Sequence, residues 1–167
     1  MPSPYNQPDY NTLPSSGFRV SIKRIPGVVY NVVSTSIPAV TSNPVVTPTP
    51  FTNLKNTPDR LIFEDFSMTY RVSENLSNYQ EIFSWLEGIT FPESFDQYAA
   101  EKRRNEMKSD IEVTILNSKQ SPVARCTLIN AFPISLSGLS FTTEVDGITY
   151  VENTAVFSYD YFKISSI

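Results

Sequence analysis

The sequence of 167 residues contains no histidine, one cysteine and five glycines. The absence of histidine removes the usual general base near neutral pH and the commonest side-chain ligand for transition metals. A single cysteine, Cys126, cannot form a disulfide within the chain or a multi-cysteine metal site. None of the glycines belongs to a phosphate-binding G-x-G-x-x-G or G-x-x-x-x-G-K pattern. These absences argue against an enzyme and predict neither a cofactor nor a metal site.

Positive charge is also scarce, because 13 Lys and Arg stand against 17 Asp and Glu. Binding to a phosphate backbone depends on clustered Lys and Arg, so this balance argues against nucleic-acid binding as the main activity. The basic cluster Lys102-Arg103-Arg104 is flanked by Glu101 and Glu106, which favours a solvated surface. No apolar run approaches about 18 residues and no signal pattern opens the sequence. We therefore expect a chain made in a cytoplasm that does not enter a membrane.

The strongest pattern that is present runs from Arg60 to Phe91, where a strand leads into a helix. Strand side chains alternate with a period of two, so one face of the strand carries the apolar residues. The predicted buried residues of this strand are Ile62, Phe66, Met68, Tyr70 and Val72.

Apolar residues three or four positions apart follow this strand and predict one amphipathic helix of about three turns. The predicted stripe is Leu76, Tyr79, Ile82, Phe83 and Leu86. Ser77 and Gln80 have the spacing of a capping box, with Asn75 as a competing cap. Gly88 is expected to end the helix in a left-handed conformation.

Shorter alternating patterns predict further strands at 18–22, 110–117, 123–132 and 150–164. Pro26-Gly27 is a turn signal, so 28–36 is interpreted as the return strand of a hairpin with 18–22. Cys126 falls in the strand at 123–132, where we expect a buried structural thiol. The predicted fold class is mainly β: two packed antiparallel sheets, sandwich or barrel-like, with one flanking α-helix.

Two proline-rich segments interrupt these patterns. Residues 1–16 predict a flexible N-terminal arm, either a disordered tail or a segment that orders against a partner. Residues 17–167 then form a single domain with a long loop at 41–58, expected to be extended but not paired into a sheet. Phe51 and Leu54 either anchor this loop on another subunit or tuck it onto its own domain.

Three blocks in order, at 24–38, 48–86 and 132–162, resemble the tail tube proteins of contractile-tailed bacteriophages. That family shares its fold with the inner-tube protein of type VI secretion systems. The first block runs from Arg24-Ile25-Pro26 to Ile37-Pro38. The second includes the strand and the helix described above. The third includes Phe132-Pro133 and the final strand. The resemblance spans roughly residues 18 to 164 as an ordered set.

The resemblance implies two orthogonally packed sheets with a helix at the side. It further implies self-association into stacked rings of six copies, whose strands close an inner β-barrel through which viral DNA passes without specific binding. Tail sheath or baseplate proteins would be partners, in a virion tail assembled in the host cytoplasm. Within this picture, the expected subunit contacts are Phe51, Leu54, Glu64, Asp65 and Trp85.

Two alternatives stay open at this point. A tube initiator, or a baseplate or tail-completion ring of the same fold, would form one ring instead of a polymer. A small β-sandwich ligand-binding module would instead use the aromatic side chains of 91–98 to line a pocket and would remain a monomer.

Overall fold

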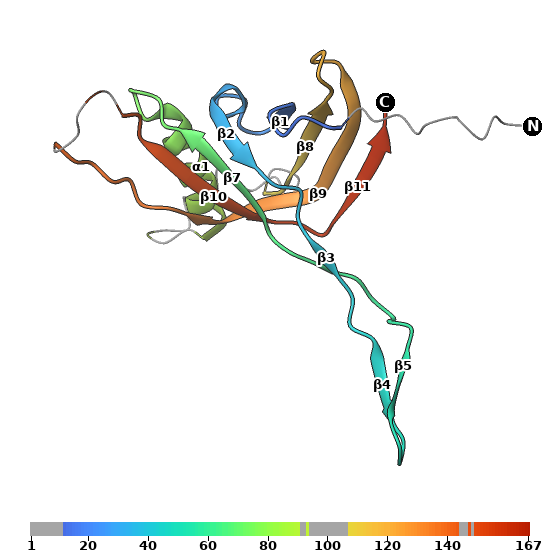
Figure 1. Ribbon diagram of the computed structural model, residues 1–167. Helices are drawn as coiled ribbons and strands as arrows, with labels where there is room; N and C mark the ends of the chain where they lie inside the picture. Colours follow the sequence, from blue (N-terminus) through green and yellow to red (C-terminus); the bar gives the residue numbers. More distant parts are fainter. Residues whose placement is uncertain (1–11, 91–92, 94–106, 144–146, 148) are drawn as a thin grey trace, which may run out of the picture.

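The computed structural model describes residues 12–90, 93, 107–143, 147 and 149–167 (Figure 1). Most of the expected N-terminal arm lies outside these residues, as do the basic cluster at 102–104 and, apart from Glu93, the aromatic segment 91–98. The division into an arm at 1–16 and a domain at 17–167 therefore stays a prediction.

The described residues form antiparallel strands and one α-helix, α1 (Ser77–Thr90). A short 3-10 turn, η1 (Val29–Asn31), lies between the first two strands. The strands are β1 (Phe18–Ile22), β2 (Val32–Thr35), β3 (Val40–Thr41), β4 (Val45–Pro48), β5 (Asn53–Asn56), β6 (Ile62–Phe63), β7 (Phe66–Arg71), β8 (Ser109–Leu116), β9 (Pro122–Leu136), β10 (Glu152–Ser158) and β11 (Tyr161–Ser166).

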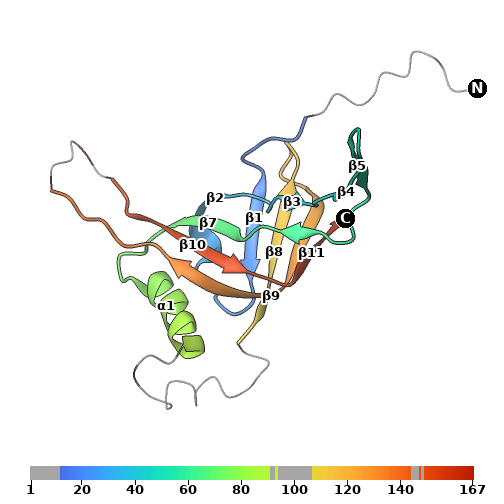
Figure 2. The same ribbon diagram turned by 90° about the horizontal axis from the view of Figure 1, so that it is seen from below.

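The large sheet has the strand order β1-β8-β9-β10-β7-β2, and β11 also pairs with β9. Strand β9 belongs to two layers, because its first part pairs with β8 and β11 and its last part pairs with β10. At the change of partner Asn130 has a φ of 57°. Figure 2 shows β7 and β10 running across β1 and β8. The result confirms the predicted fold class of two packed antiparallel layers.

The core fills the space between these layers. The predicted alternation holds at Val20 and Ile22 in β1, at Phe66, Met68 and Tyr70 in β7, and at Ile111 and Val113 in β8, all of which are buried. Cys126 is fully buried, as expected for a structural thiol. The prediction was wrong at Ile62, which is exposed because the chain leaves the body of the fold there.

The predicted hairpin of 18–22 with 28–36 does not form. Strand β1 pairs with β8, with Phe18 opposite Ile115, and β2 pairs with β7 in the other layer. The chain between them buries Ile25 and Val28 in the core, so it crosses from one layer to the other instead of turning back. The predicted strand 150–164 is likewise divided into β10 and β11, which take different partners.

Helix α1 exists as predicted, but it is rotated relative to the predicted stripe. Its buried residues are Asn78, Ile82, Trp85 and Gly88, whereas Phe83 is about half exposed. Hydrogen bonds of a buried polar side chain explain this rotation. The Asn78 amide donates to the Arg71 carbonyl at 2.8 Å, and the side-chain oxygen of Asn78 accepts from the Ser73 N–H at 3.1 Å. These bonds turn the Asn78 side toward the sheet.

The ends of α1 also differ from the prediction. The Asn75 side chain, not a Ser77-Gln80 box, caps the start by accepting from the Ser77 N–H at 3.1 Å. Gly88 does not end the helix, which continues to Thr90. Burial of Gly88 against the fold explains why the residue is small there.

Candidate functional site

The segment 39–64, called the arm from here on, projects away from the body of the fold (Figure 1). Strands β3 and β6 pair at its base, and β4 and β5 pair farther out with Val45 opposite Asn56. The expectation of an unpaired loop at 41–58 was therefore wrong. A two-stranded ribbon tolerates proline at its free edges and ends, and Pro48 lies at the last position of the β4–β5 ladder.

The arm is fixed where it leaves the body. The Phe63 ring lies 5.5 Å from Phe162 and 6.3 Å from Tyr159, measured between ring centroids. The Tyr159 hydroxyl donates to the Glu64 carbonyl at 2.7 Å, and the Glu64 N–H donates to the Ala39 carbonyl at 3.1 Å. Burial, followed by nearby acidic groups, raises the pKa of Tyr159 to about 12, so its hydroxyl keeps its proton as donor. These contacts fix the direction of the arm.

Beyond its base the arm has no core of its own. All residues of β4 and β5 are exposed. Phe51, in the turn, is 99% exposed and Leu54 is 53% exposed. An isolated two-stranded hairpin is marginally stable in water, and clustered exposed apolar side chains mark interaction surfaces. The arm therefore exposes an apolar surface of the kind found at interaction sites. Val40, Val45, Val46, Leu61 and Ile62 are further exposed apolar residues of the arm.

Four of the five predicted contact residues lie on the arm or next to it. Phe51 and Leu54 are in its outer part, and Glu64 and Asp65 are exposed at its base. Their location on one projecting element was not apparent from the sequence pattern.

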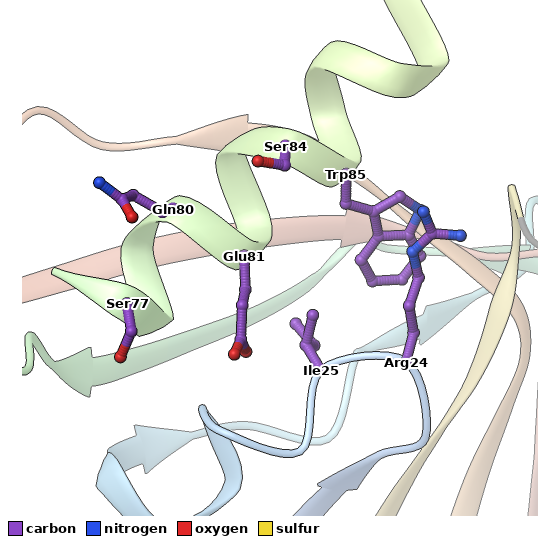
Figure 3. Close-up of a pocket in the computed structure, with 7 residues that line it drawn as sticks. All are labelled: Arg24, Ile25, Ser77, Gln80, Glu81, Ser84 and Trp85. Carbon is purple, nitrogen blue, oxygen red and sulfur yellow. The ribbon is translucent and has the colours of Figure 1, made fainter. Parts of the chain in front are cut away.

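The fifth, Trp85, lies in the core instead. It is 1% exposed, its ring centroid is 5.9 Å from that of Phe157, and its indole N–H donates to the Met107 carbonyl at 2.9 Å. The Arg24 guanidinium covers the ring at 5.1 Å from its centroid (Figure 3). A side chain enclosed in this way presents no surface to a second subunit in this fold.

A shallow hollow of about 440 Å³ lies between α1 and the segment after β1 (Figure 3). Arg24, Ser77, Gln80, Glu81 and Ser84 supply its polar groups. Its lining residues include no lysine or histidine.

A second exposed apolar surface, which no sequence pattern predicted, lies in the connection between β9 and β10. Phe141 and Tyr150 there are 75% and 64% exposed. They line a hollow of about 380 Å³. The available clue was the pair Asp146-Gly147 between them in the sequence, a dipeptide typical of tight turns.

The described residues contain no group of three or more Cys, Asp or Glu side chains placed to hold a metal ion. Within the same residues, no helix is both long enough and apolar enough to cross a bilayer.

One protein family matches the sequence, and several solved structures share the fold. The phage tail tube protein family matches residues 14–165. No curated protein sequence matches the chain significantly. Among solved structures, the tube-terminating cap of the anti-feeding prophage is similar with a TM-score of 0.68, 15% identity and 93% and 92% of the two chains covered.

Two structures of an extracellular contractile injection system, called PVC, are also similar. One, from its sheath–tube complex, gives a TM-score of 0.65 at 14% identity over 95% of both chains. The other, from its sheath/tube terminator, gives 0.64 at 20% identity over 92% of this chain and 96% of that one. At these identities the likeness shows a shared fold. With a family match over nearly the whole sequence, this chain belongs to the phage tail tube protein family.

Proposed function

We propose that this chain is a structural subunit that assembles with its own copies into stacked rings of six, which form the tube of a phage tail. The observation that carries the proposal is the arm, which is fixed at its base and apolar in its outer part with no core of its own. Such a surface needs a partner, and in a tube the partner is another copy of the same chain. In this proposal the chain acts through its shape and its contacts with other copies and does not catalyse a reaction.

Passage of viral DNA through the tube agrees with the charge of the chain. With a net charge of −4, stacked copies present a surface that does not hold phosphate groups. DNA would then slide along the inner wall without specific binding. Tail sheath or baseplate proteins are the proposed outer partners, and the virion tail is the proposed location, after assembly in the host cytoplasm.

Negative-stain electron microscopy of the purified protein tests the proposal. Rings or tubes are the expected particles. The double variant Phe51→Ser, Leu54→Ser should abolish them while changing the free energy of unfolding by less than about 0.5 kcal/mol, since both side chains are exposed. Phe83→Ser, a loss of one exposed aromatic side chain from α1, is the matched control and should leave assembly intact. Discrete wild-type monomers at micromolar concentration would overturn the proposal and favour a ligand-binding module.

A second candidate within the same fold is a ring that starts or closes the tube. It is favoured by the similarity to a tube-terminating cap and a sheath/tube terminator, which is as close as the similarity to a chain of a sheath–tube complex. Particle length separates the two: a terminal or baseplate ring stops at one layer at high protein concentration, whereas a tube subunit forms stacks of growing length.

A further inference from the structure

Two projections leave the body of the fold on opposite sides. The arm is one of them, and the described parts of the connection between β9 and β10 (137–143, 147 and 149–151), called the receiving loop from here on, are the other. Figures 1 and 2 both show the two pointing away from each other. Because the arm of a copy cannot reach its own receiving loop, any contact between them joins two copies head to tail.

The receiving loop has a hollow at its root with two aromatic rings in its wall. Its lining residues are Gly138, Ser140, Phe141, Thr142, Thr149, Tyr150, Val151 and Glu152. Its volume of about 380 Å³ is more than ten times the roughly 30 Å³ that one water molecule occupies in the liquid. At Gly138 the space beside the backbone is open, since an added Cβ would meet no atom within 4 Å.

Tyr150, in the wall of the hollow, is held in place by a charged neighbour. The Arg71 guanidinium lies 5.2 Å from the centre of the Tyr150 ring and its Nε is 3.8 Å from a carboxylate oxygen of Glu152. These contacts orient Tyr150 before any partner arrives, which lowers the entropy lost on binding.

The arm and the receiving loop also differ in charge. Lys55 is the one charged residue in the sequence 40–58. Glu152 lines the hollow, and no Lys or Arg is among the lining residues. Opposite charge at the rim of an apolar contact guides two surfaces into register.

We propose that the Phe51 ring of one copy inserts between Phe141 and Tyr150 of a second copy, with Lys55 near Glu152. The inference rests on the proposed function, since it names the surface that receives the arm in the assembly. A ring that is 99% exposed gains most by entering a preformed hollow lined by two other aromatic rings. Repetition of this contact joins copies in one direction and leaves an arm free at one end of the stack.

Cysteine cross-linking between copies tests the contact. Thr52→Cys next to Phe51 and Ser140→Cys in the hollow are placed in separate proteins, leaving all the aromatic side chains intact. Cys126 stays in both proteins because it is buried. The mixed, assembled proteins are treated with a short bis-maleimide, and a cross-linked dimer is expected. Thr52→Cys mixed with Lys119→Cys, in the exposed β8–β9 turn, is the matched control and should give none.

The same samples are examined by electron microscopy, which separates the two possible failures. Rings or tubes that give no 52–140 cross-link would overturn this inference and leave the proposed function standing. Monomers without any particle would overturn both. Adding Phe51→Ser to the Thr52→Cys protein should lower the cross-link yield about tenfold or more, whereas an unchanged yield would show that Phe51 is not the anchor.

Discussion

The side-chain amide of Asn130 donates a 2.6 Å hydrogen bond to one carboxylate oxygen of Asp160. The other oxygen accepts from Lys108 at 3.3 Å. Asn130 lies where β9 changes partner, and Asp160 lies between β10 and β11. The Asn130 backbone N–H donates to the Asp110 carboxylate at 3.0 Å. Polar bonds thus hold the corner where the two layers meet, because the strand ladders are interrupted there.

Replacing Asp160 by Asn should make stability less dependent on pH. The hydrogen bond from Asn130, and then Lys108, lower the pKa of Asp160 below its ordinary value of 3.8. A lowered carboxyl pKa contributes stability above the unfolded value, and this contribution is lost as the pH falls through the folded value. The difference in melting temperature between wild type and Asp160→Asn should therefore be largest at pH 7 and shrink below about pH 4.

The matched control for this measurement is Asp59→Asn, which removes an exposed carboxylate on the arm that lies 3.7 Å from Arg60. Its melting temperature should follow wild type at every pH. A constant gap between wild type and Asp160→Asn from pH 7 to pH 3 would show that the carboxylate of Asp160 does not hold the corner.

Two aromatic residues of α1 should differ sharply in their contribution to stability. Trp85→Ala empties a site in the core and should lower the free energy of unfolding by about 3–5 kcal/mol. Phe83→Ala removes a half-exposed ring stacked on Tyr79 and should cost about 0.5–1.5 kcal/mol. Guanidinium denaturation measures both. Equal losses would mean that the helix is rotated toward the stripe predicted from the sequence.

Local patterns predicted elements well and their pairing badly. Alternation at 18–22 and 66–70 indicates strands because successive side chains of a strand point to opposite faces, so the pattern involves only residues close in sequence. Pairing depends on residues far apart in the sequence, such as Phe18 and Ile115, and no local signal reports it. The buried Asn78 illustrates the same limit, since its partners Arg71 and Ser73 become visible only once β7 and α1 are packed.

The candidate site was predictable in part. Phe51 and Leu54 were found because apolar residues stand out in a polar, proline-rich segment. Trp85 was placed outward because α1 carries more apolar residues than one face can hold, and the sequence does not show which face is buried. Tyr150 was missed because the alternating pattern placed it in a strand at 150–164, whereas β10 begins at Glu152. Phe141 was missed because its exposure depends on where β9 ends, which the sequence does not show.

The thiol of Cys126 should be unreactive in the folded protein. The side chain is fully buried, and burial raises the pKa of this thiol, so the reactive thiolate is scarce. A thiol reagent at pH 8 should label no group per chain in native buffer and one group in 6 M guanidinium. Rapid labelling of the native protein would show that the strands around β9 separate. The cross-linking experiment would then have to be done with proteins that also carry Cys126→Ala.

Gly17 should tolerate no side chain, whereas Gly138 should. A Cβ at buried Gly17 would collide with the carbonyl oxygen of Leu116, whose N–H donates to the Gly17 carbonyl at 2.8 Å. Gly17→Ala must therefore push β1 away from the end of β8, at a cost of about 1–3 kcal/mol. Gly138→Ala meets open space and should change stability by less than about 0.5 kcal/mol. Thermal melting of the two variants against wild type distinguishes these outcomes, and a Gly17→Ala protein as stable as wild type would contradict the close approach of the chain entering β1 to the end of β8.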